Sequence, residues 1–129
     1  MKVGIIFGTW DILHAGHIHL LREAKKRCDW LVVGIHVNPK IERRNKNKPI
    51  ETLWERTMKL TACKFVDVVT PYEYEYEIPL ILTTQNVDVR FLGSDYKGTD
   101  KPITAKSQVP IEYIDSIDIH TSDIRKRLK

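Results

Sequence analysis

Short apolar runs recur along the chain, and polar segments or stretches with helical spacing separate them. Continuous β-branched runs are typical of strands buried on both faces, whereas apolar residues three and four positions apart are typical of amphipathic helices. On these criteria we predict five strands, at 3–7, 30–37, 65–69, 88–92 and 110–114. We predict helices at 13–27, 52–64 and 78–84, and a final helix that begins near 121.

The segment 72–77 alternates tyrosine with glutamate, which is also compatible with a strand. We interpret it as a loop that leads into the 78–84 helix, because a βαβαβ order needs a helix there and Pro79 suits a first turn. Strands that alternate with helices predict a parallel, doubly wound α/β sheet. Ligands bind such sheets beyond the carboxyl ends of the strands, where the strand order reverses. The loops at this edge would be 8–17, 36–49, 71–76, 93–108 and 115–122.

The stretch 7–17 carries the clearest chemistry of the chain. Gly8 ends the first predicted strand, and Asp11 is placed to cap the helix that follows. The unpaired N–H groups and the dipole of a helix N-terminus favour anions. His14 and His17 are three residues apart, so both imidazoles project from one face of the first turn. We therefore expect two cation-capable donors beside a phosphate-binding turn.

Gly16 lies between the two histidines, where the missing side chain lets a ligand's flat ring or sugar approach the backbone. A single helical histidine is more often solvated than functional, but two at this spacing after a strand and a Gly-Thr turn favour a functional role. A metal-binding pair is the other functional interpretation. It would need further ligands, and neither a cysteine cluster nor a second His/carboxylate set is available. We therefore predict no metal held by the protein alone.

The residues Gly8-Thr9-Trp10-Asp11 and His14-Ala15-Gly16-His17 resemble the His-x-Gly-His signature of the small nucleotidyltransferases, most closely the glycerol-3-phosphate cytidylyltransferase group. The resemblance implies a single domain over 1–129 with a Rossmann-like, doubly wound sheet of five parallel strands in the order 3-2-1-4-5, flanked by helices. It also implies transfer of CMP from CTP to a small phosphorylated alcohol, with release of pyrophosphate. Mg²⁺ would accompany the triphosphate, and the enzyme would be a homodimer.

The resemblance further implies roles for individual residues. His14 and His17 would stabilise the negative charge that develops during nucleotidyl transfer, and Lys46 would assist them while it holds the acceptor phosphate. Lys46 and Lys48 form a Lys-x-Lys pair within the basic segment 40–49, although such a run is often only a solvated surface. The expected nucleotide-binding residues are Gly8, Thr9, Trp10, Asp11, His14, Gly16, His17, Lys48, Gly93, Asp95, Thr121 and Ser122.

Two residues are expected on the acceptor side besides Lys46. Arg56 lies in Trp54-Glu55-Arg56, which matches the family's Glu-x-Arg element, and it would face the acceptor phosphate. The alternative is an ordinary exposed helix arginine. His36 ends the second predicted strand, and we weigh an acceptor contact equally against a simple strand-end histidine.

The turn Gly93-Ser94-Asp95-Tyr96 resembles the family's Gly-x-Asp-Trp turn. Asp95 would hold Mg²⁺ or acceptor hydroxyls there, or it would only cap the turn. Lys97 and Lys101 are weaker candidates in the same loop.

The segment 115–122 departs from the family's Arg-Thr-Glu-Gly-Ile-Ser-Thr-Thr-like motif. Thr121 and Ser122 keep hydroxyls that would hold the β- and γ-phosphates, but the arginine is missing and His120 replaces a smaller residue. This segment lines the family's base pocket, so ATP is an alternative to CTP, as in the pantetheine-phosphate and flavin adenylyltransferases. A non-catalytic nucleotide- or nucleic-acid-binding module is a second alternative, which the two intact histidines oppose.

The overall composition adds further limits. At 129 residues the chain is long enough for one domain, and too short for the class I aminoacyl-tRNA synthetases that carry a similar histidine signature. The longest apolar runs fall well below the roughly 20 residues of a membrane span. The first strand begins at once and leaves no room for a signal peptide, so we expect a cytoplasmic protein.

The net charge of +4 is concentrated at 40–48. It suits a nucleoside triphosphate and is also compatible with weak nucleic-acid binding; a nucleic acid is the less favoured partner, and we expect no membrane partner. The distant Cys28 and Cys63 are expected to be reduced. Aromatic residues are available for a dimer interface or for core packing: Trp54, Tyr72, Tyr74 and Tyr76.

Overall fold

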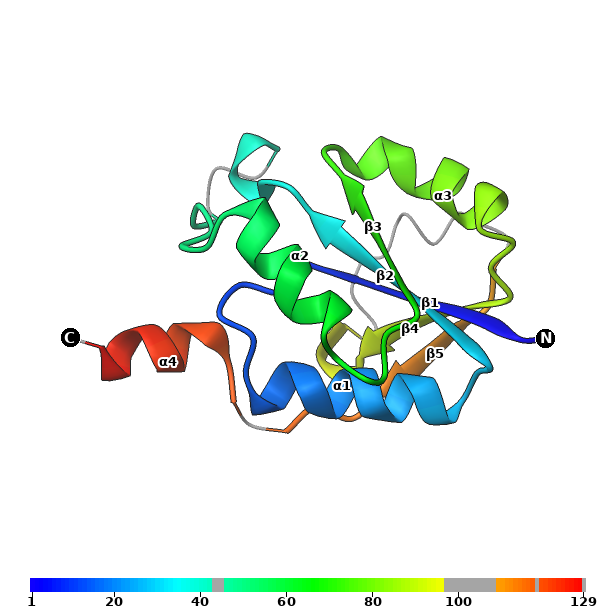
Figure 1. Ribbon diagram of the computed structural model, residues 1–129, viewed down its shortest axis with the longest axis horizontal. Helices are drawn as coiled ribbons and strands as arrows, with labels where there is room; N and C mark the ends of the chain where they lie inside the picture. Colours follow the sequence, from blue (N-terminus) through cyan, green and yellow to red (C-terminus); the bar gives the residue numbers. More distant parts are fainter. Residues whose placement is uncertain (43–45, 97–108, 118, 129) are drawn as a thin grey trace.

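The computed structural model describes residues 1–42, 46–96, 109–117 and 119–128 (Figure 1). Its strands are β1 Val3–Gly8, β2 Trp30–His36, β3 Val68–Tyr72, β4 Val89–Gly93 and β5 Ile111–Ile114. Its α-helices are α1 Ala15–Lys26, α2 Leu53–Thr61, α3 Ile78–Thr84 and α4 Thr121–Arg127. Short 3-10 turns lie at Pro39–Ile41, Glu75–Glu77 and Ser94–Tyr96.

The five strands form one parallel sheet in the order β3-β2-β1-β4-β5, which confirms the predicted fold. Gly8 of β1 is paired with Ile35 of β2, and the next residue, His36, is paired with Tyr72 of β3. The carboxyl ends of these strands therefore meet at one edge of the sheet. The strand order reverses between β1 and β4, where ligands bind sheets of this kind.

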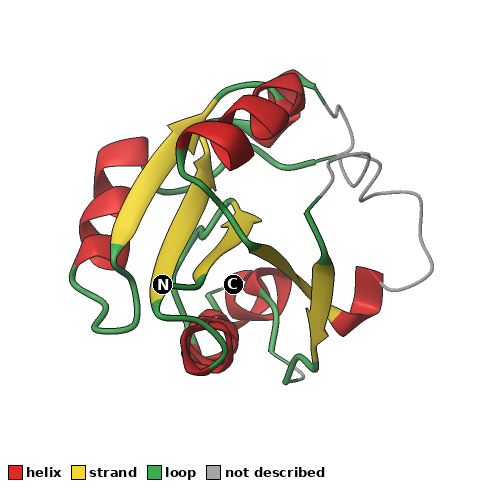
Figure 2. Cartoon of the chain, turned by 90° about the vertical axis from the view of Figure 1, so that its right-hand side faces the viewer, coloured by secondary structure: helices red, strands yellow, loops and turns green. Residues whose placement is uncertain are grey.

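The sheet has a separate hydrophobic core on each face, as Figure 2 shows with helices on both sides of the strands. Because successive strand residues point to opposite faces, Ile6 packs with α1 and α2 while its neighbour Ile5 packs with α3. Gly34 of β2 is paired with Phe7 of the neighbouring strand β1, and its missing side chain leaves room for the Phe7 ring. A Cβ at Gly34 would lie 2.2 Å from Cδ1 of Phe7, so this position has no room for any side chain.

The structure corrects the predicted third strand, which spans 68–72 instead of 65–69. Asp67 explains the later start, because its carboxylate accepts the backbone N–H of Leu31 at 2.8 Å and pairs with Lys25. Phe65 packs against the core cluster before the strand begins. Helix α2 also ends at Thr61, earlier than predicted. The 72–77 segment leads into α3 through a 3-10 turn, in agreement with the loop interpretation.

Cys28 and Cys63 are free thiols, as expected. None of the helices in the described part of the chain combines the length and the apolar character that a membrane crossing demands.

Candidate active site

The turn between β1 and α1 has an unusual backbone that its surroundings hold in place. Trp10 and Ile12 have φ angles of 58° and 50°, in the left-handed region that non-glycine residues rarely adopt. Trp10 is buried and donates its indole N–H to the Gly34 carbonyl at 3.0 Å. The side chain of Trp10 therefore anchors the turn, while one side of it still lines the site.

Asp11 does not cap helix α1, contrary to the prediction. The N-cap is His14, and the Asp11 carboxylate points instead to the segment before α2. There it accepts the backbone N–H groups of Ile50 at 2.8 Å and Glu51 at 3.0 Å. Glu51 in turn accepts the N–H of Ile12 at 2.8 Å. The turn after β1 and residues 50–51 thus each donate hydrogen bonds to the other.

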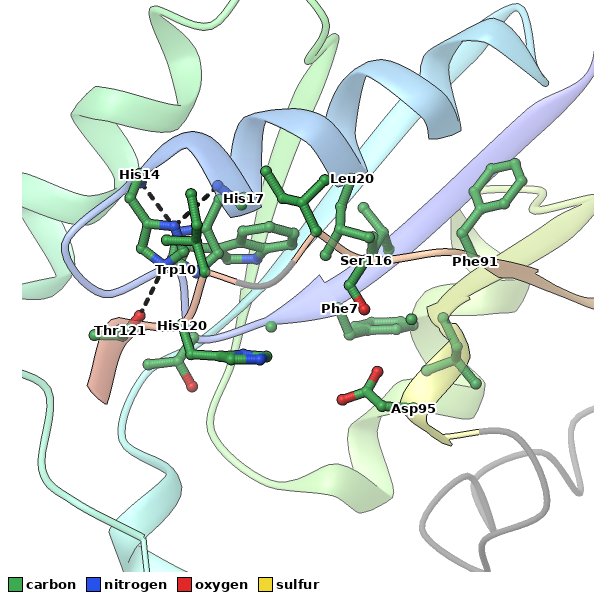
Figure 3. A pocket seen from close by; sticks show the side chains of 18 residues that line it. Phe7, Trp10, His14, His17, Leu20, Phe91, Asp95, Ser116, His120 and Thr121 are labelled. Atoms are coloured by element: carbon green, nitrogen blue, oxygen red, sulfur yellow. Dashed lines mark hydrogen bonds between the residues drawn. The ribbon is translucent and has the colours of Figure 1, made fainter. Parts of the chain in front are cut away.

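His14 and His17 lie face to face at the start of α1, with ring centroids 3.9 Å apart (Figure 3). Nδ1 of His14 accepts the N–H of Gly16 at 3.0 Å, and Nδ1 of His17 accepts the N–H of His14 at 3.3 Å. In a neutral imidazole with an acceptor Nδ1, the proton lies on Nε2. The Thr121 hydroxyl agrees with this assignment, because it donates to the Asp11 carbonyl at 3.1 Å and can accept from His14 Nε2 at 3.3 Å.

Both histidines are neutral near pH 7 in the unliganded protein. Burial, followed by the positive charge of His14, lowers the pKa of His17 to about 3. Burial also lowers the pKa of His14, and His120 and Arg127 add to this effect. The two cation-capable donors of the prediction are therefore neutral Nε2–H donors in the unliganded protein. A bound triphosphate would raise both pKa values, since nearby negative charge favours the protonated ring.

A pocket opens beside these donors, at the reversal of strand order between β1 and β4 (Figure 3). It brings together many of the predicted nucleotide-binding residues: Gly8, Thr9, Trp10, His14, Gly16, His17, Gly93, Asp95 and Thr121. The segment after β5 adds Ser116, Ile117, Ile119 and His120 to its wall. The first pocket, as we call it, therefore combines polar groups at the histidine end with apolar and polar groups at the 116–120 end.

Gly16 has a structural reason for its small size besides the predicted approach of a ligand. A Cβ at this position would lie 2.6 Å from the carbonyl oxygen of Ile119. The glycine thus lets the segment after β5 pass close to the start of α1. His19 holds the same segment by donating Nε2–H to the Asp115 carbonyl at 2.8 Å. These contacts position the far wall of the first pocket.

A second pocket adjoins the first and shares Thr9, Trp10, His17 and Thr121 with it. Lys46 and Ser122 line this second pocket together with His17. Lys48 is exposed and is in the wall of neither pocket. The two lysines of the Lys-x-Lys pair are therefore in different environments.

Arg125 is a site residue that the sequence interpretation missed. It lines the second pocket and donates to the Asp11 carboxylate at 2.9 Å. The sequence interpretation named only the arginine that is missing from 115–122. The available signal was helical spacing, because residue 125 lies four positions after Thr121 and so projects from the same helix face.

Arg56 is neither at an acceptor site nor exposed, and both expectations are corrected. It is 2% exposed, and among the described residues its guanidinium donates to four backbone carbonyls. These acceptors are Glu51 at 3.2 Å, Thr9 at 2.9 Å, His36 at 2.7 Å and Val37 at 2.7 Å. Arg56 therefore fastens the carboxyl ends of β1 and β2 to the start of α2.

His36 also lies outside the two pockets. Its side chain is buried against Tyr72, with ring centroids 4.7 Å apart, and its Nε2 lies 3.6 Å from a Glu42 carboxylate oxygen. Of the other aromatic candidates, Tyr74 and Tyr76 stack on one another and Trp54 is exposed. Lys97 and Lys101 lie outside the described residues.

The described residues contain no cluster of three or more histidine, cysteine or acidic side chains that would hold a metal. Asp95 is an exposed carboxylate in the wall of the first pocket. A single carboxylate fits Mg²⁺ that arrives with phosphate and water ligands, because this ion rarely uses an all-protein cage.

Comparisons with known proteins identify the family to which this chain is similar. The family model described as Cytidylyltransferase-like matches residues 5–127. Ethanolamine-phosphate cytidylyltransferase of Arabidopsis thaliana is 33% identical over 98% of this chain and 32% of that protein. Bifunctional protein HldE of Campylobacter fetus subsp. fetus is 34% identical over 95% of this chain and 27% of that protein. The chain thus spans less than a third of the length of these two relatives.

Two further proteins are similar over most of their own length. FAD synthase of Thermococcus sibiricus is 34% identical over 95% of this chain and 84% of that protein. A lipopolysaccharide core biosynthesis protein of Thermoplasma volcanium GSS1 has a TM-score of 0.77 and 29% identity, and the match covers 92% of this chain and 99% of that one. With a family model that matches nearly its whole length, this chain belongs to the cytidylyltransferase-like family of nucleotidyltransferases.

Proposed function

We propose that this chain transfers CMP from CTP to a small phosphorylated alcohol of the glycerol-3-phosphate kind and releases pyrophosphate. The observation that carries the proposal is the stacked pair of Nε2–H donors, His14 and His17, at the reversal of strand order. Two fixed neutral donors suit a reaction in which negative charge builds up on phosphate oxygens.

In this reaction a phosphate oxygen of the acceptor attacks the α-phosphorus in line with the leaving group. The new P–O bond forms as the bond to pyrophosphate breaks, and the electron pair leaves on the pyrophosphate oxygen. The protein's contribution is to position the two phosphates and to stabilise the five-coordinate state. His14 and His17 would donate to oxygens of the α- and β-phosphates. Lys46, in the second pocket, would bind the negatively charged phosphate of the acceptor through its ammonium group.

The phosphates of the nucleotide have a set of donors around the shared wall of the two pockets. The hydroxyls of Thr121 and Ser122 and the guanidinium of Arg125 would hold the β- and γ-phosphates. Mg²⁺, bound with the nucleotide, would neutralise part of the triphosphate charge. Asp95, in the wall of the first pocket, would bind this ion through water. The base would lie toward the wall formed by Ser116, Ile117, Ile119 and His120.

CTP is our first choice of nucleotide because the family description and the Arabidopsis relative both name cytidylyl transfer. ATP is the specific alternative, since FAD synthase is also similar over most of its length. Pyrophosphate release measured with each of the four nucleoside triphosphates, over a panel of phosphorylated polyols and amino alcohols, distinguishes them. We expect turnover with CTP. Turnover with ATP alone would show that the nucleotide is ATP and not CTP. Absence of turnover with all four nucleotides would refute the proposed reaction.

A homodimer is a separate proposal. Trp54 and Met58 are exposed four residues apart on one face of α2, an apolar surface that a second copy would cover. Light scattering coupled to size-exclusion chromatography tests it, with Trp54→Lys expected to shift a dimer toward the monomer mass.

A further inference from the structure

Asp11 makes more contacts within the protein than a nucleotide-binding carboxylate needs. It is 5% exposed, and its two oxygens accept from Ile50 N at 2.8 Å, Glu51 N at 3.0 Å and Arg125 Nη2 at 2.9 Å. Its backbone carbonyl accepts the Thr121 hydroxyl at 3.1 Å. Asp11 is therefore the meeting point of three segments that are far apart in the sequence.

The first of these connections fixes the basic segment. Residues 50 and 51 are tied to the turn after β1 by Asp11, by the contact of Glu51 with the Ile12 N–H, and by Arg56, which donates to carbonyls of both Thr9 and Glu51. Lys46 lies only four residues before this anchor and lines the second pocket. Where Lys46 can reach therefore depends on how firmly residues 50–51 are held.

The second connection fixes α4. This helix has seven residues, and none of them is buried. Its first turn contacts the rest of the protein through the Thr121 hydroxyl, which bonds to Asp11 and His14. One turn later, Arg125 reaches the Asp11 carboxylate. Polar contacts with Asp11 therefore hold α4 in a part of the fold where none of its side chains is fully buried.

We propose that Asp11 is a positioning residue, which sets Lys46 and Arg125 around the histidine pair without itself contacting the nucleotide. The proposal rests on the nucleotidyl transfer proposed above and revises the expected role of Asp11 in nucleotide binding. A carboxylate is a poor direct partner for a triphosphate, because like charges repel. Asp11 instead positions two cationic side chains, Lys46 and Arg125, for the phosphates, while its own oxygens accept hydrogen bonds from protein donors.

Asp11→Asn is the test, because asparagine keeps the shape but replaces one acceptor oxygen with an NH₂ donor. We expect kcat to fall about tenfold or more, since small displacements of catalytic groups have effects of this size. Backbone amide exchange at Ile50 and Glu51 is expected to become faster. Asp11→Asn should lower kcat by a factor about threefold or more smaller when it is introduced into Arg125→Gln than when it is introduced into the wild-type protein. The reason is that the effects of substitutions at residues in contact are not additive.

Lys126→Gln provides the matched background. Lys126 is the next residue, carries the same charge and is exposed, so the full loss caused by Asp11→Asn should persist there. Wild-type kcat in Asp11→Asn, an equal loss in the two backgrounds, or unchanged amide exchange would each overturn the proposal. If Asp11→Asn does not fold, Arg125→Gln alone must speed amide exchange in α4 and Lys126→Gln must not. If the wild-type protein turns over no nucleotide, the proposed reaction fails, while amide exchange still decides whether Asp11 holds these segments.

Discussion

His14 has two roles that a pair of substitutions can separate. Its Nδ1 accepts the Gly16 N–H at 3.0 Å and so caps α1, while its Nε2–H is a donor at the site. His14→Ala removes both. His14→Asn keeps an acceptor oxygen near the position of Nδ1, and asparagine is among the best N-cap residues. It removes the Nε2–H donor, because its side chain is too short to replace the far side of the ring.

The expected magnitudes follow from these contacts. Loss of one transition-state donor costs about 2.7–4 kcal/mol, or roughly a hundredfold to a thousandfold in kcat, and should appear in both variants. Loss of the N-cap costs about 1 kcal/mol in the free energy of unfolding and should appear only in His14→Ala. Pyrophosphate release gives the first quantity, and urea denaturation followed by circular dichroism gives the second.

Lys26→Gln is the control, because Lys26 lies on the same helix but is exposed and lines neither pocket. Its kcat should stay within about threefold of the wild-type value, well below the effect of losing a transition-state donor. Near wild-type turnover by His14→Asn would refute the catalytic role of His14. An activity loss confined to His14→Ala would show that the cap, and not the donor, matters.

Three further predictions concern stability, pH and the basic segment. Arg56→Met should destabilise the fold by about 3–5 kcal/mol, because it leaves carbonyls of Thr9, His36 and Val37 without their donor; an unchanged urea midpoint would contradict this. The pKa of His17 is about 3 in the folded protein and 6.5 in the unfolded chain, so between these pH values the unfolded chain is protonated at His17 and the folded protein is not. As the pH is lowered from 6.5 to 3, the free energy of unfolding should therefore fall by up to about 1.4 kcal/mol per pH unit. His17→Gln should reduce that slope in urea titrations at pH 7, 6, 5 and 4, and a slope equal to the wild-type slope would refute the assignment. Lys46→Ala should lower kcat/KM at least about tenfold and Lys48→Ala clearly less, because only Lys46 lines the pocket; equal losses would contradict the placement.

The fold was predictable because its information is local. Each apolar run identified a strand, and the spacing of apolar residues identified the helices that connect them. The third strand was displaced because Asp67 bonds to Leu31 on the neighbouring strand, a contact between residues 36 positions apart. A single-sequence pattern contains no record of such a partner.

The site divides in the same way. His14, His17 and Thr121 stand at positions that local spacing identifies, and the structure brings their side chains together. The partners of Arg56, Asp11 and Arg125 depend on long-range geometry, since Arg56 bonds to Thr9 across 47 residues and Arg125 to Asp11 across 114. The neutral state of the histidines could not be predicted either, because it follows from burial that only the folded chain creates.

Helix α4 has no buried residue, and this has a consequence for local stability. A segment without buried residues opens by itself at a small fraction of the global unfolding free energy. A nucleotide that contacts Thr121 and Arg125 would bind only when α4 is folded against the rest of the protein. Its binding free energy would therefore stabilise this closed position of α4 over the locally open one. The substrate would then provide the helix with the attachment that other helices obtain from a hydrophobic core.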